Sequence, residues 1–192
     1  MQNMLIPERE TARLLLRGFA PADLDDLAVI LHKPEVMKFL GTGQAIERAE
    51  AEETLHSMNR HWERHGFGRW AVVHKAERKL IGFAGLRSFH GMPELMYLLD
   101  REYWGCGLAT EVAEFCLHFG FREQGFDRIT AFARAGNVAS RRVLVKVGMR
   151  FERKMKFKTA LKMLGVKGKG DEMWPNAYLM QYALSQDEYE SR

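Results

Sequence analysis

The chain has 192 residues, enough for one domain with a substantial hydrophobic core. Its composition, 46% hydrophobic and 28% charged, is that of a globular protein, and its formal net charge of +4 permits an anionic ligand without indicating nucleic acid. The two cysteines, Cys106 and Cys116, exclude a disulfide framework and a CxxC metal site. No segment has the pattern of a signal peptide or a membrane span, so we expect a cytoplasmic protein without a membrane partner.

The first half of the chain is predicted to contain both strands and helices. In chain order we expect a strand over residues 11–17, a helix that opens at Pro21 and ends before Pro34, a short helical turn over 35–40, a long helix over 47–65, and two strands over 69–76 and 79–88. Gly66 follows the long helix, where a C-cap glycine belongs. Only two residues separate the strands, which predicts a hairpin, and Gly82 and Gly85 indicate a bulge or a close approach of two backbones.

Residues 94–124 combine a strand, a glycine-containing turn and a helix. Residues 94–99 read as a strand, and the segment from Trp104 to Thr110 contains Gly105 and Gly107, which can bring bare backbone close to a ligand. Helical periodicity begins at Ala109. Because the first amides of a helix have no intrahelical partner, this arrangement predicts an anion site. An ordinary tight turn is the alternative, and the motifs of P-loop and dinucleotide-binding proteins are absent.

The remaining elements close the fold. In chain order we expect a strand over residues 127–134, a short helix over 139–147 opened by Asn137, and two mutually antiparallel strands over 149–158 and 177–184. The sequence of the linker over 159–175 does not clearly predict a helix or a strand. Residues 150–170 contain eight Lys or Arg and one acidic residue, Glu152. Such a stretch is either a solvated loop or a surface for an acidic substrate, a phosphate or RNA.

Three segments of the chain resemble the GNAT superfamily of acetyl-CoA-dependent N-acyltransferases, and in particular its RimJ/RimL-like branch. They are TARLLLRGFAPADLDDL, YLLDREYWGCGLATE and NVASRRVLVKVGM, and the closing YALSQDEY resembles the end of that branch. The resemblance implies a single acyltransferase domain over residues 1–192. It also implies an α/β fold with a mostly antiparallel sheet of about seven strands, a splayed parallel pair formed by the fourth and fifth strands, and about four flanking helices.

The resemblance implies how acetyl-CoA is bound. Backbone amides of the glycine turn would bind the pyrophosphate, which assigns Trp104, Gly105, Cys106, Gly107, Leu108, Ala109 and Thr110 to the coenzyme. Trp104 departs from the usual Arg or Gln. Tyr97, Leu98 and Leu99 would lie along the pantetheine arm, with the Leu99 N–H as donor to the thioester oxygen.

The resemblance also assigns residues of the short helix. Asn137 would contact the arm, Ser140 would lie near the sulfur, and Arg141 and Arg142 would reach phosphates. Without the resemblance, Asn137 and Ser140 would be read as helix caps, and either arginine as a solvated side chain.

The catalytic residues are less clearly defined by the sequence. Many members of the superfamily use a tyrosine as the acid, but the matching position here is Leu144, so Ser140 or a water molecule would have to protonate the thiolate. Glu94 is the best candidate for the base, acting through water, and a strand-end salt bridge is its alternative role. His90 and His74 are weaker candidates. No cluster has metal-ligand spacing, so we expect no metal.

The predicted activity is transfer of acetyl to a primary amine, either the α-amine of a protein N-terminus or the amine of a small molecule. An α-amine is favoured because its pKa near 7.7–8.0 demands less of a base than a lysine does. Two other functions stay open: a non-catalytic acyl-CoA-binding module, and an RNA- or ribosome-binding protein that uses residues 150–170. Sparse aromatic residues in that stretch make nucleic acid an improbable partner. The resemblance is compatible with a homodimer.

Overall fold

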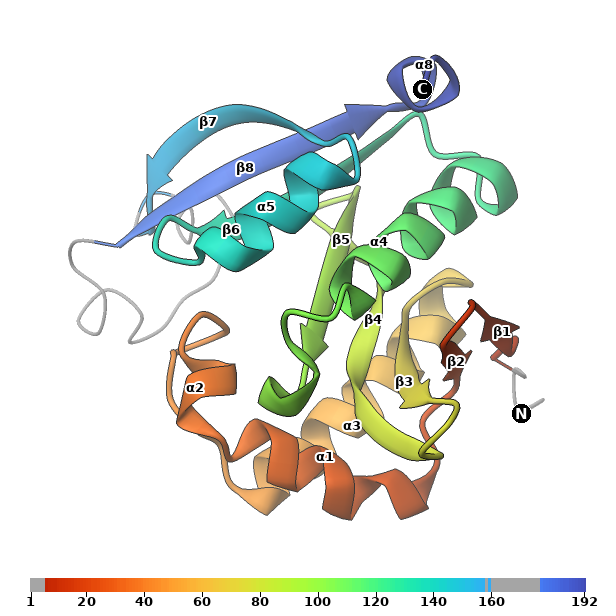
Figure 1. Cartoon of the computed structure of the whole chain (residues 1–192), viewed down its shortest axis with the longest axis vertical. Helices are drawn as coiled ribbons and strands as arrows, with labels where there is room; N and C mark the ends of the chain where they lie inside the picture. Colours follow the sequence, from red (N-terminus) through yellow and green to blue (C-terminus); the bar gives the residue numbers. More distant parts are fainter. Residues whose placement is uncertain (1–5, 158, 160–176) are drawn as a thin grey trace.

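A computed structural model shows an open mixed sheet of eight strands with helices on both faces (Figure 1). It describes residues 6–157, 159 and 177–192. The strands are β1 (Arg9–Glu10), β2 (Leu14–Arg17), β3 (Arg69–His74), β4 (Lys79–Phe89), β5 (Met92–Leu99), β6 (Arg128–Arg134), β7 (Arg150–Lys156) and β8 (Tyr178–Ser185). Their order in the sheet is β1-β2-β3-β4-β5-β6-β8-β7. Among these strands β5 and β6 run parallel, and the other neighbours are antiparallel.

The helices begin and end at residues with recognisable local chemistry. They are α1 (Leu24–Leu31), α2 (Pro34–Met37), α3 (Arg48–His65), α4 (Leu108–His118), α5 (Val138–Lys146) and α8 (Gln186–Glu190). Pro34 occupies the first turn of α2, where a missing N–H costs nothing. Gly66 ends α3 in the left-handed conformation, with φ 74°, as the sequence predicts.

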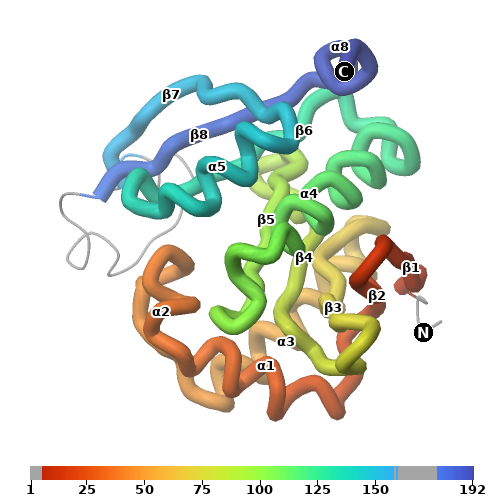
Figure 2. Tube along the Cα trace, viewed as in Figure 1, coloured from red at the N-terminus to blue at the C-terminus, as the bar shows by residue number. Residues whose placement is uncertain are grey.

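Two apolar layers enclose the sheet. On one face α1 and α3 bury Leu27 and Met58 against Phe83 of β4. On the other face α4 buries Val112 and Cys116 in a core that includes Trp70 of β3. The tube trace shows α1 and α3 lying apart from α4 and α5, with β3, β4 and β5 between the two groups (Figure 2). The helices therefore supply both layers of the core, and the site lies where the central strands separate.

The predicted α/β fold is confirmed, and the differences have local causes. The sheet has eight strands because residues 9–10 add a short edge strand, β1. β5 begins at Met92, two residues before the predicted start, because Pro93 continues the hairpin opposite Ser88. The predicted helix over 109–124 is divided into α4 and a π-helical turn over Phe119–Glu123. α8 was not predicted, and most of the 159–175 linker lies outside the described residues.

The glycines of β4 bring neighbouring backbones close together. A Cβ on Gly82 would lie 2.0 Å from the Leu98 carbonyl oxygen, and one on Gly85 would lie 2.1 Å from the Gly68 carbonyl oxygen. The register between β3 and β4 also shifts at Val72/Val73, opposite Gly82. Both features that the sequence suggested, a bulge and a close approach, are present.

The two halves of the sheet meet at a narrow junction. β5 and β6 share one paired position, Glu94 with Thr130, although both strands continue beyond it. The edge of β5 from Leu95 to Leu99 is therefore open toward β6. None of the helices in the described part of the chain has the length and apolar character that a membrane span requires.

Candidate active site

A pocket of about 440 Å³ occupies the opening between β5 and β6. Its wall includes Tyr97 of β5 and Leu144 of α5 from one face of the sheet, and Glu94 and Met96 from the other face. Side chains of successive strand residues point to opposite faces, so the pocket has walls on both sides of the sheet. Two molecules entering from opposite faces could meet at the β5 edge.

The open edge of β5 presents the backbone of Leu99 to the pocket. The Asp100 N–H donates to the Ile81 carbonyl of β4 at 2.7 Å. Because alternate residues of a strand turn their amides to opposite edges, the Leu99 amide faces β6. The indole Nε1 of Trp104 donates to the Leu99 carbonyl at 2.7 Å. Trp104 thus fastens the glycine turn to the end of β5, a role that the sequence did not indicate.

The glycine turn places the N-terminus of α4 at the pocket wall. Gly105 and Gly107 have φ values of 81° and 86°, which a residue with a Cβ rarely adopts. Gly107 is the N-cap of α4, and its carbonyl accepts the Glu111 N–H at 3.0 Å. The amides of the first turn have no earlier carbonyl to bond. Gly105, Gly107, Leu108, Ala109 and Thr110 line the pocket, as Trp104 does.

Tyr97 and Ser140 both line the pocket and are in direct hydrogen-bond contact. The Tyr97 hydroxyl lies 3.0 Å from Ser140 Oγ and donates to the Ser140 carbonyl at 3.2 Å. Burial raises the pKa of Tyr97 to about 12, against a smaller lowering by the hydrogen bond with Ser140. The phenol is therefore protonated near neutral pH. Asn137 Oδ1 accepts the Ser140 N–H at 3.1 Å, so Asn137 caps α5 and lines the pocket as well.

Leu144 contributes an apolar side chain to the same wall. It is 1% exposed and lies in the core beneath α5. The position carries no titratable group, and Ser140, one turn earlier, is the nearest hydroxyl on that helix.

The two adjacent arginines of α5 point in different directions. Arg142 is exposed and lines the pocket, whereas Arg141 does not line it. Arg141 donates to the Tyr182 hydroxyl at 3.1 Å and to the Ala135 carbonyl at 3.2 Å, because consecutive helical residues are rotated by about 100°. Lys146 lines the pocket beside Arg142. The i, i+4 spacing of Arg142 and Lys146 is the signal in the sequence that points to Lys146, which is not among the residues predicted to bind the coenzyme.

Glu94 lies on the face of the sheet opposite Tyr97 and Ser140. Glu94 lines the pocket, and its carboxylate accepts the Arg87 Nε–H at 2.8 Å. The Glu94 side chain is 5% exposed and that of Arg87 is 27% exposed. The strand-end salt bridge that the sequence allowed as an alternative is therefore present. Val36, Phe39 and Phe132 supply apolar walls to the pocket.

Some residues considered in the sequence lie away from the pocket. Cys106 does not line it, and its Sγ contacts the Tyr103 carbonyl. Neither His74 nor His90 is part of the wall. In the described parts of the chain, no group of three His, Cys, Asp or Glu side chains could hold a metal ion.

A pocket at a splayed parallel strand pair, with a glycine turn and a helix N-terminus at one end, can offer backbone donors to an anionic ligand. The family model of the acetyltransferase (GNAT) domain matches residues 13–150. The chain is 30% identical to the uncharacterized N-acetyltransferase YoaA of Bacillus subtilis, over 77% of this chain and 85% of that protein. It belongs to the GNAT acetyltransferase family and is an acetyl-CoA-dependent N-acetyltransferase by that membership.

Solved structures share the fold at low sequence identity. One is the ribosomal-protein-S5-alanine acetyltransferase from Vibrio fischeri, with a TM-score of 0.70 and 20% identity over 95% of this chain and 98% of that one. Another is spermidine N-acetyltransferase from Vibrio cholerae in complex with CoA and spermine, with a TM-score of 0.71 and 18% identity over 94% and 99% of the two chains.

Proposed function

We propose that this chain binds acetyl-CoA in the pocket between β5 and β6 and transfers the acetyl group directly to the α-amine of a protein or peptide. The observation that carries the proposal is the single paired position between β5 and β6, Glu94 with Thr130, beside a glycine turn and a helix N-terminus. The pyrophosphate would bind the amides of residues 104–110, near the positive charges of Arg142 and Lys146. The pantetheine arm would pair with the open β5 edge at Tyr97, Leu98 and Leu99.

The reaction follows from this placement. The amine nitrogen attacks the thioester carbon, the carbon–sulfur bond breaks, and CoA leaves. The Leu99 N–H stabilises the developing oxyanion, and Ser140 donates a hydrogen bond to the departing sulfur. Glu94 accepts the amine proton through water, and Arg87 holds its carboxylate in place through the 2.8 Å ion pair. Asn137 contacts the arm.

The charges in the pocket support an α-amine rather than a polyamine. Among its described wall residues Glu94 is the single carboxylate, and it is already paired with Arg87. A polyamine, with several ammonium groups, would find few partners here, whereas an N-terminal residue brings one amine and an apolar side chain for Val36 and Phe39. The RimJ/RimL-like resemblance supports the same class of acceptor.

Calorimetry with acetyl-CoA tests the binding site. Gly107→Trp forces a bulky side chain onto a backbone with φ 86° and against Arg13, so it should displace the amides of the turn, and we expect it to abolish the binding seen with the wild type. Gly125→Trp is the matched control, because Gly125 also has a positive φ (66°), faces open space and lies away from the pocket. Absence of binding by the folded wild type would refute the proposal. Binding without turnover on any amine would instead favour the non-catalytic module.

A competition between acceptors tests the substrate class. A peptide with a free N-terminus and no lysine is compared with the same peptide blocked by N-acetylation and with spermidine. We expect acetylation of the free peptide alone. Preferential acetylation of spermidine would show that the charge reasoning is wrong while leaving the acetyltransferase activity intact.

A further inference from the structure

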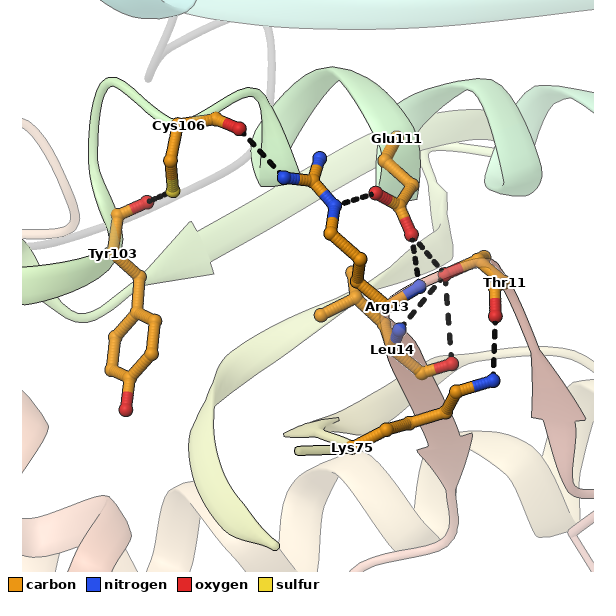
Figure 3. Close-up of polar contacts among 7 residues, drawn as sticks. All are labelled: Thr11, Arg13, Leu14, Lys75, Tyr103, Cys106 and Glu111. Atoms are coloured by element: carbon orange, nitrogen blue, oxygen red, sulfur yellow. Dashed lines mark hydrogen bonds and ion pairs between the residues drawn. The ribbon is translucent and has the colours of Figure 1, made fainter. Parts of the chain in front are cut away.

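A cluster of four residues joins the N-terminal segment to the glycine turn and to the start of α4 (Figure 3). It consists of Thr11, Arg13, Cys106 and Glu111, and we call it the Arg13 cluster. Arg13 precedes β2, whereas Cys106 and Glu111 lie more than 90 residues later in the chain. Of these residues, none lines the pocket. The mechanism proposed above uses none of their side chains.

Glu111 is the hub of the Arg13 cluster. Its carboxylate accepts the Arg13 Nε–H at 2.7 Å, the Arg13 backbone N–H at 2.8 Å and the Thr11 hydroxyl at 2.5 Å. Burial raises the pKa of Glu111, but the hydrogen bonds from Thr11 and Arg13 outweigh it and hold that pKa below its usual value. Glu111 is therefore an anion in the first turn of α4. Arg13 offsets this negative charge close to the proposed pyrophosphate site.

Arg13 also bonds the turn itself. Its Nη1–H donates to the Cys106 carbonyl at 2.8 Å (Figure 3). The described chain has no cis peptide bond, so the Gly107 N–H points opposite to that carbonyl. The side of the peptide that faces away from Arg13 carries the amide hydrogen. A Cβ built on Gly107 would lie 3.5 Å from Arg13 Nη2, which places the guanidinium against the back of the turn.

The glycines on either side of Cys106 make this contact important. Glycine tolerates many backbone conformations, so the peptide between Cys106 and Gly107 could rotate at little steric cost. A rotation would turn a carbonyl oxygen, rather than an amide hydrogen, toward a bound phosphate. The Arg13 hydrogen bond opposes that rotation.

We propose that Arg13 is a positioning residue for the pyrophosphate: it holds the Cys106 carbonyl behind the glycine turn and thereby keeps the Gly107 amide directed at the coenzyme. This inference rests on the proposed binding mode. It predicts a defect that depends on the pyrophosphate of the donor, not on the acetyl group or the amine.

The test compares two acyl donors. Acetyl-CoA carries the pyrophosphate, and S-acetylpantetheine carries the same thioester and arm without it. We expect Arg13→Gln to raise the KM for acetyl-CoA by about tenfold or more, the range for loss of charge-assisted hydrogen bonds. Its kcat/KM for S-acetylpantetheine should stay within about twofold of the wild type. Arg13→Lys keeps the charge but cannot bond Glu111 and Cys106 in the same geometry, so its KM should be intermediate.

Arg9→Gln is the matched control. It removes another arginine of the N-terminal segment, which forms a 2.7 Å ion pair with Glu123 away from the turn. We expect it to change neither donor's kinetics. Glu111→Gln is a second variant that weakens the anchor of Arg13 without altering the turn, and it should shift the KM for acetyl-CoA in the same direction.

The outcomes separate this inference from the proposed function. Equal losses with both donors in Arg13→Gln would show a general structural role and overturn the inference. An unchanged acetyl-CoA KM in Arg13→Gln would overturn it too, and either result leaves the acetyltransferase intact. If Arg13→Gln does not fold, an unchanged donor preference in folded Glu111→Gln overturns it. A wild type that turns over both donors equally well would refute the pyrophosphate site itself.

Discussion

Replacing Glu94 by glutamine separates its two possible roles. The substitution keeps the size of the side chain and removes one charge of the Arg87–Glu94 ion pair. Arg87 is 27% exposed, so water can solvate the guanidinium that loses its partner. We therefore expect a loss of about 1–2 kcal/mol in the free energy of unfolding, below the range for a fully buried pair.

The expected kinetic effect of Glu94→Gln depends on the acceptor. At pH 7.5 roughly a third of an α-amine with a pKa near 7.8 is neutral, but only about one lysine amine in a thousand. The neutral fractions of the two amines differ about 250-fold, which corresponds to roughly 3 kcal/mol of activation free energy. Solvent alone can supply the neutral α-amine, so Glu94→Gln should lower kcat/KM for a peptide N-terminus by less than about tenfold. A lysine-type amine should lose about a hundredfold or more, as for a missing general base.

The assay follows release of the CoA thiol with both acceptors between pH 6.5 and 9, alongside urea unfolding. Glu35→Gln is the control, because Glu35 is an exposed acid at the start of α2 that lies outside the pocket wall. A hundredfold loss with the peptide N-terminus would refute the reasoning that a low-pKa amine makes the base dispensable. Unchanged kinetics with both acceptors, together with reduced stability, would assign Glu94 to the ion pair alone.

Three further predictions concern single groups. Tyr97→Phe removes the hydroxyl that bonds Ser140, so kcat should fall by about three- to tenfold with little change in the KM for acetyl-CoA, measured by steady-state kinetics. A wild-type kcat in that variant would leave Tyr97 without a role in orienting Ser140. Burial lowers the pKa of His61 to about 4, and its Nε2 accepts the Ser88 N–H at 3.1 Å. Because the folded pKa lies below the unfolded value of about 6.5, neutral His61 contributes stability above pH 6.5, and this contribution is lost as the pH falls toward 4. His61→Gln has no such titration, so its urea midpoint should fall less than that of the wild type over this pH range. Burial raises the pKa of Cys116, so a thiol reagent should label exposed Cys106 alone in the native protein and both cysteines in urea.

Local chemistry made most of the fold predictable. Proline and glycine marked helix ends, as Gly66 does for α3, and apolar periodicity marked the buried faces, as Val112 and Cys116 do for α4. β1 and α8 were missed because they are two and five residues long and carry little periodicity. The start of β5 was predicted two residues late, because proline is rare inside strands and Pro93 therefore suggested a loop.

The site was predictable where it is contiguous and hidden where it is assembled from distant segments. The spacing of Gly105 and Gly107 within residues 104–110 is enough to predict a glycine turn. By contrast, nothing in one sequence indicates that Glu111 bonds Arg13, 98 positions earlier. The direction of Arg141 was equally inaccessible, because it depends on the Tyr182 hydroxyl, supplied by β8.

If the coenzyme arm lies along β5 as proposed, the narrow junction between β5 and β6 makes the stability of the fold depend on the bound donor. One paired position joins the two parts of the sheet, so a coenzyme arm lying along β5 would serve as an additional strand. A ligand at a hundred times its Kd stabilises the folded state by about 2.7 kcal/mol. Scarcity of acetyl-CoA would then leave the enzyme easier to unfold and to degrade, so its abundance would follow the concentration of its own donor.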